Sequence, residues 1–172
     1  MFFLMLFVLT TDVHAQTTQV DYTAGVAMYK QKDYKKSVVH FNMYLTANPT
    51  DYAGYYNRAL AYKHLKKTVE AVNDLSRAIA LHPAKEIYIL RATLYNTLNR
   101  YDEALADLNN ALQMDSANYK ALYQRGIAYV ALGKTAEAIA DFDNAISKTP
   151  DANVYTINYT RYIETIDNDI AQ

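Results

Sequence analysis

The chain shows almost none of the residue patterns that carry out catalysis. It has no Cys and four His, so thiolate ligands and thiol nucleophiles are absent. None of the four His is spaced four residues from another, as on the metal-binding face of a helix. The Gly residues are isolated and no Gly-x-Ser-x-Gly sequence occurs, which excludes a phosphate-binding loop and a nucleophile elbow. We therefore expect no enzyme activity, no metal site and no cofactor.

One pair of opposite charges does recur at a fixed spacing. Three Arg residues are each followed, 16 positions later, by an Asp; the pairs are Arg58 with Asp74, Arg91 with Asp107, and Arg125 with Asp141. Arginine binds a carboxylate through two parallel hydrogen bonds, so the spacing predicts an ion pair between neighbouring helices. A ladder of Arg that binds an acidic ligand is the alternative. We favour the structural role because each Asp accompanies its Arg.

The segments that hold these pairs are repeated along the chain. The sequences at 56–62, 89–95 and 123–129 resemble one another, and so do those at 70–79, 103–112 and 137–146. A weaker copy lies at 24–49. In every copy, small and large apolar residues share one helix face, which predicts two helices in close contact. Pro49, Pro83 and Pro150 end the second helices, and Asn99 and Gly133 suit a left-handed helix cap between the two.

This pattern resembles the tetratricopeptide repeat family, whose unit is a helix–turn–helix of about 34 residues. Small residues stand at its position 8 and large ones at position 24: Gly25 and Phe41, Ala59 and Leu75, Ala92 and Leu108, Gly126 and Phe142. The resemblance implies an all-α fold, a right-handed superhelical solenoid of antiparallel helix pairs. Four repeats are expected at about 18–51, 52–84, 85–118 and 119–152. The pattern is broken at Asp21, Tyr44, Ser116 and Leu122.

The resemblance also implies a binding surface, because first helices in this family line a concave groove that takes peptides or a helix. The family's groove positions carry over to Tyr22, Val26, Tyr29, Lys30, Tyr56, Leu60, Lys63, His64, Ile89, Asn96, Tyr123 and Ile127. Tyrosine gives a large amphipathic contact, which favours binding. The alternative is that these Tyr only pack against neighbouring helices. The carboxylate clamp of the chaperone-binding members is not supported, because Tyr22 and Val26 replace its Lys and Asn.

These residues predict a non-catalytic scaffold that binds a protein or peptide segment. A chaperone that holds unfolded partners is the alternative. The net charge of −1 does not indicate a nucleic-acid partner, which would need a strongly basic face, and no segment is long and apolar enough for an integral membrane span. Residues 17–84 carry a net charge of +4 and residues 85–172 one of −4, which favours at most a weak head-to-tail self-association.

The two ends of the chain have separate interpretations. Residues 1–15 predict a signal peptide, with an apolar run from Phe2 to Leu9 and a cleavage site after Ala15. They indicate export to the periplasm or cell envelope. No basic residue precedes the run, which leaves a cytoplasmic location and a buried N-terminal segment open. Residues 153–172 predict a helix that caps the last repeat, with a docking helix for another protein as the alternative.

Overall fold

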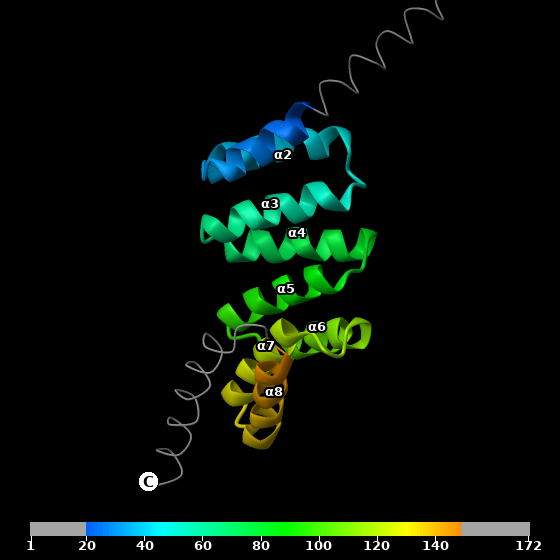
Figure 1. The fold of residues 1–172 in the computed structure, drawn as a ribbon. Coiled ribbons are helices and arrows are strands. Elements are labelled where there is room, and N and C mark those ends of the chain that lie inside the picture. The colour runs from blue at the N-terminus through cyan, green and yellow to red at the C-terminus, as the bar shows by residue number, and fades with distance from the viewer. Residues whose placement is uncertain (1–19, 149–172) are drawn as a thin grey trace, which may run out of the picture. The chain divides into compact units, whose positions relative to one another are not determined.

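The computed structural model describes residues 20–148, which form eight helices and no strand (Figure 1). The first helix covers 20–30. The others are α2 (Tyr34–Ala47), α3 (Tyr52–His64), α4 (Thr68–Leu81), α5 (Lys85–Thr97), α6 (Tyr101–Met114), α7 (Tyr119–Ala131) and α8 (Thr135–Lys148). The all-α fold class expected from the repeats is confirmed over this range. The predicted signal peptide and the predicted capping helix lie outside the described residues.

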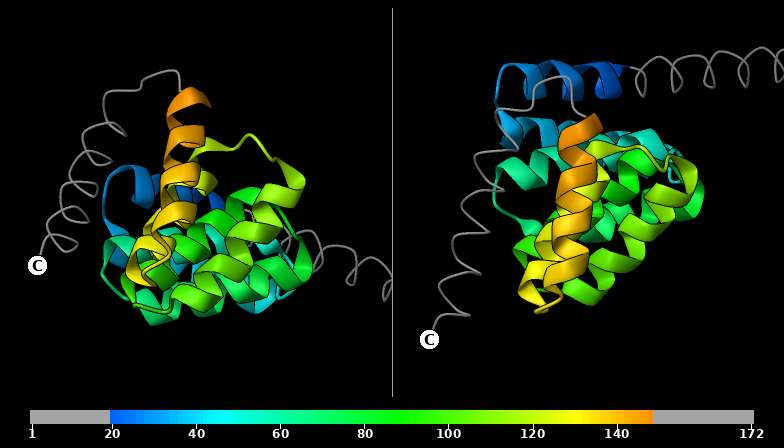
Figure 2. Two further views of the ribbon diagram at one scale, coloured as in Figure 1. Left: turned by 90° about the horizontal axis from the view of Figure 1, so that it is seen from below. Right: turned by 60° about the horizontal axis from the view of Figure 1, so that its bottom comes forward.

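The helices belong to two compact units, an N-terminal unit up to Pro83 and a C-terminal unit from Ala84. In the N-terminal unit α3 packs against α4 and against α2. In the C-terminal unit α5 packs against α6, α7 packs against α8, and α7 also contacts α6 and α5. Figure 2 shows the same helices from two further directions. None of the helices between residues 20 and 148 is long and apolar enough to cross a bilayer.

The turn inside each helix pair is built in the same way four times. One residue takes a left-handed backbone conformation, with φ of 63° at Lys32, 60° at Lys66, 57° at Asn99 and 70° at Gly133. The N–H of the next residue then bonds a carbonyl five residues back, as in Lys67 to Tyr62 at 2.9 Å. The predicted caps at Asn99 and Gly133 are therefore confirmed. Lys32 and Lys66 adopt the same conformation although it costs an ordinary residue about 1 kcal/mol.

The core consists of small residues packed against large ones. Small residues with no exposed surface include Ala59, Ala71, Ala78, Ala92, Ala104, Ala111, Ala138 and Ala145. The large residues at position 24 are Phe41, Leu75, Leu108 and Phe142, and none is more than 1% exposed. Since an Ala side chain adds little bulk, the helix backbones of a pair can approach closely while the large side chains fill the remaining space.

Positions 8 and 24 are matched in volume within each repeat. A β-carbon added to Gly126 would lie 2.5 Å from the Phe142 ring, and one added to Gly25 would lie 3.0 Å from the Phe41 ring. Where position 24 is Leu, as in the second and third repeats, position 8 is Ala. Gly therefore accompanies Phe and Ala accompanies Leu, which keeps the summed volume nearly constant.

The departure at Tyr44 is compensated in a similar way. The other repeats have Ala where Tyr44 stands, and its larger ring needs space against α3. Gly54 provides it, because a β-carbon there would lie 2.9 Å from the Tyr44 ring and 2.7 Å from the Leu45 side chain. The Tyr44 hydroxyl donates to the carboxylate of Asp51, which also caps the N-terminus of α3. Burial and this carboxylate raise the pKa of Tyr44 to about 12.

The volume match between Gly126 and Phe142 predicts that Gly126→Ala lowers the stability of the wild-type chain but not that of a Phe142→Leu variant. Gly126→Ala in the wild-type chain should destabilise by about 1–3 kcal/mol through overpacking. In the Phe142→Leu background the same change should be neutral or stabilising, because the clash is gone and Ala favours a helix over Gly by about 1 kcal/mol. Urea denaturation of the four variants measures both effects. An equal cost of Gly126→Ala in the two backgrounds would contradict the volume match.

Candidate peptide-binding surface

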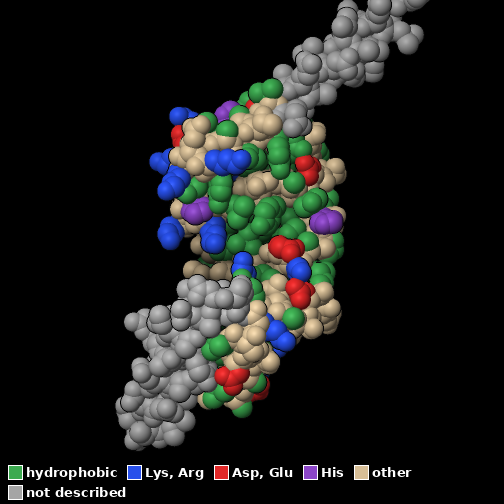
Figure 3. All heavy atoms as spheres, viewed as in Figure 1, with side chains coloured by type: hydrophobic (Ala, Val, Ile, Leu, Met, Phe, Trp, Pro, Cys, Tyr) green, Lys and Arg blue, Asp and Glu red, His purple; other side chains and the backbone are tan. Residues whose placement is uncertain are grey.

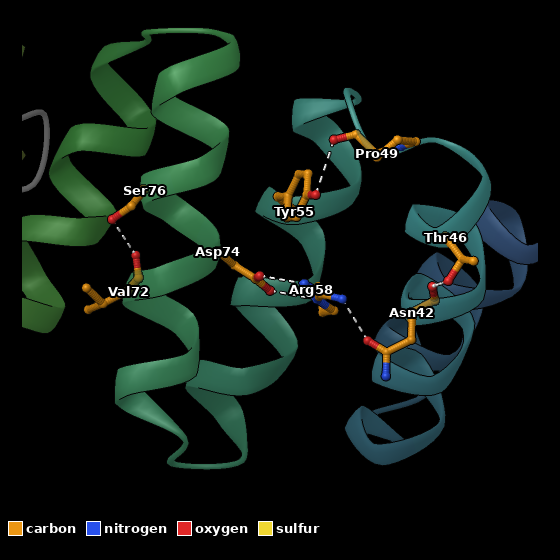
Figure 4. Close-up of polar contacts among 8 residues, drawn as sticks. All are labelled: Asn42, Thr46, Pro49, Tyr55, Arg58, Val72, Asp74 and Ser76. Atoms are coloured by element: carbon orange, nitrogen blue, oxygen red, sulfur yellow. Dashed lines mark hydrogen bonds and ion pairs between the residues drawn. The ribbon is translucent and has the colours of Figure 1, made fainter.

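The predicted Arg–Asp pairs are confirmed in three repeats. Arg58 on α3 donates from Nε and Nη2 to the two carboxylate oxygens of Asp74 on α4, at 2.7 and 2.6 Å (Figure 4). Arg91 and Asp107 join α5 to α6 at 2.7 Å for both bonds, and Arg125 and Asp141 join α7 to α8 at 2.7 and 2.8 Å. Each carboxylate raises the pKa of its guanidinium.

The guanidinium groups also reach the preceding repeat within a unit. Arg58 Nη1 donates to Asn42 on α2 at 2.8 Å, and Arg125 Nη1 donates to Asn109 on α6 at 2.8 Å. One Arg therefore ties three helices together (Figure 4). The Nε, Nη1 and Nη2 atoms of Arg58 all donate hydrogen bonds within the protein, and its partner Asp74 is only 6% exposed. An acidic ligand would therefore have to compete with these bonds. The interpretation of the Arg ladder as a ligand site is not supported.

In the first repeat a different pair stands where Arg and Asp are missing. His40 Nδ1 lies 3.4 Å from the carboxylate of Asp21, across the pair formed by helix 20–30 and α2. Both side chains are partly exposed, His40 at 32% and Asp21 at 18%. His40 is therefore a partner for Asp21 in a packed helix pair, as expected for a partly buried core residue. Asp21, one of the four departures from the family pattern, is thereby engaged in a contact inside the repeat.

The predicted groove residues of the N-terminal unit come from helix 20–30 and from α3. Tyr22, Val26, Tyr29, Tyr56 and Leu60 are half-buried, whereas Lys30, Lys63 and His64 are exposed. The Tyr22 hydroxyl accepts a bond from Asn57 on α3 at 3.0 Å, and its ring contacts Phe41 and Tyr44. Burial raises the pKa of Tyr22. Tyr22 thus packs against the neighbouring first helix while part of its ring stays at the surface.

A second aromatic cluster lies at the other end of the same helices. The Tyr29 hydroxyl lies 3.0 Å from His64 Nε2 on α3. The Tyr34 ring stacks on the His64 ring, with centroids 4.3 Å apart and the planes inclined by 4°. Tyr34 begins α2, which is a second helix, and is not one of the predicted groove residues. It follows the inter-helix turn directly, which is the only sequence signal for its position.

In the C-terminal unit the predicted groove residues lie on α5 and α7. Asn96 Nδ2 donates to the backbone oxygen of Gln124 at 2.9 Å and to its side-chain oxygen at 3.2 Å. The Tyr123 ring lies 5.6 Å from Phe142 in the core. Ile89, Tyr123 and Ile127 are half-buried. In both units a polar bond therefore connects a predicted groove residue to the adjacent first helix.

These contacts support part of both interpretations of the tyrosines. Tyr22, Tyr29 and Tyr123 pack against neighbouring helices, yet none of them is fully buried. Asn57 and Gln124, which each follow a groove tyrosine in the sequence, were missed although they hold the surface together. Whether the twelve predicted residues bind a ligand stays a prediction.

A cluster of metal-binding side chains or a cavity would be a further place for a ligand in the described part of the chain. No group of three or more His, Asp or Glu capable of holding a metal ion occurs between residues 20 and 148. A cavity of about 610 Å³ in the N-terminal unit is lined by Tyr55, Arg58, Asn73, Asp74, Ser76, Arg77 and Ala80. It contains the Arg58–Asp74 pair and none of the predicted groove residues.

Comparison with known sequences identifies the repeat. Two family models, each described as tetratricopeptide repeat, match residues 56–121 and 90–156. The DnaJ homolog subfamily C member 7 homolog of Schizosaccharomyces pombe is 32% identical over 149 residues, which cover 76% of this chain and 31% of that protein. Human tetratricopeptide repeat protein 13 is 28% identical over 76% of this chain and 16% of its own length. The chain thus spans less than a third of these two curated relatives.

Comparison with solved structures confirms the fold. The crystal structure of YrrB, described as a TPR protein with an unusual peptide-binding site, matches with a TM-score of 0.78 and 22% identity over 88% of this chain and 78% of that chain. The first TPR of Spaghetti (RPAP3), bound to the HSP90 peptide SRMEEVD, matches with a TM-score of 0.65 and 27% identity over 69% of this chain and 94% of that chain.

The Arg–Asp bridges predict that two neighbouring aspartates on α8 contribute very differently to the free energy of unfolding. Asp141→Asn should destabilise the protein by about 1.5–3 kcal/mol, since the half-buried Arg125 loses its counter-charge. Asp143→Asn changes an exposed carboxylate on the same helix and should stay within about 0.5 kcal/mol of wild type. Thermal and urea unfolding measure both variants. Equal stabilities of the two variants would show that the bridge contributes nothing.

Proposed function

Because the chain belongs to the tetratricopeptide repeat family, we propose that it is a non-catalytic interaction module whose first helices bind a peptide or protein segment. The observation that carries this proposal is the row of half-buried Tyr and aliphatic side chains on adjacent first helices. In the N-terminal unit it consists of Tyr22, Val26, Tyr29, Tyr56 and Leu60. A surface that is partly apolar and already rigid can bind a segment at a low cost in side-chain entropy.

The related structures support a peptide as the ligand. The RPAP3 domain, 27% identical to this chain, was solved with an HSP90 peptide, and the second RPAP3 domain was solved with the HSP70 peptide SGPTIEEVD. The present chain has Tyr22 and Val26 where the resemblance places the carboxylate-clamping Lys and Asn. We therefore expect its ligand to be anchored by aromatic and aliphatic side chains and not by a terminal carboxylate.

The cellular setting of this activity is part of the proposal. The predicted signal peptide at 1–15 supports an exported or envelope-associated scaffold that assembles or tethers a complex. The opposite charges of the two halves of the sequence support weak head-to-tail association at low salt. A dependence of the sedimentation coefficient on salt is the expected sign of that association.

A selection from a phage-displayed random peptide library tests the groove. The best peptide should bind Tyr56→Ala/Tyr123→Ala at least 10-fold more weakly than wild type, since each aromatic anchor contributes about 1–2 kcal/mol. Tyr52→Ala/Tyr119→Ala removes two tyrosines from the first positions of the same helices, α3 and α7, and is the matched control. Its dissociation constant should change less than about threefold.

Calorimetric titrations and melting curves of all three proteins complete the test. Peptides that share no sequence and bind weakly to all three would favour the chaperone alternative. Failure to select any peptide, or equal losses in the two variants with equal melting temperatures, would overturn the assignment of the groove.

A further inference from the structure

Seven lysines surround the two inter-helix turns of the N-terminal unit. We refer to them as the lysine edge: Lys30, Lys32, Lys35, Lys36, Lys63, Lys66 and Lys67. All seven are exposed. Each lies in one of the two turns or within one helical turn of it. Figure 3 shows Lys and Arg side chains gathered along one side of this unit, with a His among them.

Contacts between aromatic rings hold the two turns beside each other. Tyr34, at the start of α2, stacks on His64, at the end of α3, and Tyr29 lies within hydrogen-bonding distance of the same His64. These contacts connect the turn at Lys32 to the turn at Lys66. The seven lysines therefore form one continuous surface and not two separate loops.

The positive charge of this surface is only partly compensated. Asp33 pairs with Lys36 at 3.0 Å and Glu70 pairs with Lys67 at 3.8 Å. Hydrogen bonds from Lys36 lower the pKa of Asp33. Within residues 20–148 the other five lysines, Lys30, Lys32, Lys35, Lys63 and Lys66, make no ion pair. Among the described residues the edge therefore holds five lysines without an ion pair.

Two of these lysines stand at positions that disfavour them. Lys32 and Lys66 are the left-handed residues of their turns, with φ of 63° and 60°. The corresponding residues in the C-terminal unit are Asn99 and Gly133, the types that tolerate this conformation best. The fold therefore gains nothing from lysine there. A residue that breaks a local rule without a structural gain indicates a functional requirement.

The C-terminal unit shows that the fold does not need a basic edge. Its two inter-helix turns hold Arg100 and Lys134, with Asp102, Glu103 and Glu137 in the first turns of the following helices. Arg100 and Glu103 pair at 2.7 Å. The same architecture is thus built there with a slight excess of negative charge. The lysine edge is a property of one unit and not of the repeat.

We propose that the lysine edge docks the protein peripherally on a membrane surface rich in anionic glycerophospholipids. Clusters of four to eight basic residues at a surface bind such membranes through the summed attraction of point charges. All seven residues are Lys, whose ammonium groups suit a diffuse charged surface, whereas paired recognition of a carboxylate favours Arg. The side chains surround exposed turns, and the cavity of the N-terminal unit is lined by other residues.

Tyr34 lies on the same edge and supports the assignment of a lipid surface. Its ring is half-buried between the turns, and tyrosine is enriched where proteins meet the headgroup region of a bilayer. An acidic protein segment would need donors arranged to meet individual carboxylates, and the edge contains no Arg for this purpose. Two of the seven lysines, Lys30 and Lys63, also belong to the predicted groove, whereas Tyr56 and Tyr123 lie outside the lysine edge. The two proposals can therefore be tested with separate variants.

Co-sedimentation of the full chain with vesicles tests the proposal. Phosphatidylcholine vesicles with and without about 30% phosphatidylglycerol are compared at ~0.1 M and ~1 M NaCl, between which the Debye length falls from about 10 to about 3 Å. Wild type should bind the anionic vesicles at low salt and release them at high salt. Lys32→Asn/Lys66→Asn should bind roughly 30-fold more weakly, at about fivefold per lysine.

The two-lysine variant separates binding from folding. Its melting temperature should equal or exceed that of wild type, because Asn adopts the left-handed conformation more readily than Lys. The control Lys134→Asn/Lys148→Asn removes the same charge from exposed positions of the C-terminal unit and should bind anionic vesicles within about threefold of wild type.

Three results would overturn the proposal. They are equal binding of wild type to neutral and anionic vesicles, equal losses in the two double variants, and binding of soluble polyglutamate without binding of anionic vesicles. The last result would assign the edge to an acidic protein. Tyr56→Ala/Tyr123→Ala should bind anionic vesicles like wild type, so failure of the groove and failure of the lysine edge are distinguishable.

Discussion

The close approach of two helix backbones at small residues is the constraint on which the rest of this structure depends. A helix pair of this length cannot bury enough apolar surface unless the two helices are nearly in contact. Ala71 and Ala78 on α4 and Ala59 on α3 have no exposed surface, so no larger side chain fits without displacement. The Arg58–Asp74 bridge connects the two helices of this closely packed pair at 2.6–2.7 Å.

The same constraint determines what is left for function. The small residues and the position-24 side chains occupy the inner faces, and Arg–Asp bridges connect the two helices in three of the four described pairs. Groove side chains such as Tyr56 and Leu60 are then held half-buried on a rigid support. The turns experience no such packing demand, since Gly133 has nothing within 4 Å of a β-carbon. Lysines can therefore accumulate at the turns of the N-terminal unit without disturbing its core.

Much of this structure could be predicted from the sequence because the repeat presents each signal several times. The Arg–Asp bridges and the left-handed caps at Asn99 and Gly133 were predicted and are confirmed. The compensation of Tyr44 by Gly54 was not predicted, because the two residues face each other only after two helices have packed. The left-handed conformation of Lys32 and Lys66 was also missed, since lysine gives no sign of it. A prediction from residue type alone is wrong where packing between helices, or the geometry of a turn, imposes a conformation that the residue does not favour.

The candidate surface was harder to predict than the core. The groove positions follow from the family resemblance, but their side chains have two roles that sequence spacing does not separate. Tyr22 bonds Asn57 and contacts Phe41, so part of its surface is structural. Tyr34 joins the cluster at His64 from a second helix, outside the pattern of first-helix positions. The identity of the bound partner depends on chemistry outside the chain.

The most direct test of the central claim is the unfolding free energy of Ala71→Leu compared with Ala80→Leu. Both residues are Ala on α4, but Ala71 has no exposed surface and Ala80 is exposed. Overpacking at Ala71 should cost about 1–3 kcal/mol, whereas Ala80→Leu should stay within about 0.5 kcal/mol of wild type. Equal stabilities of the two variants would contradict the claim that small residues set the distance between the helices.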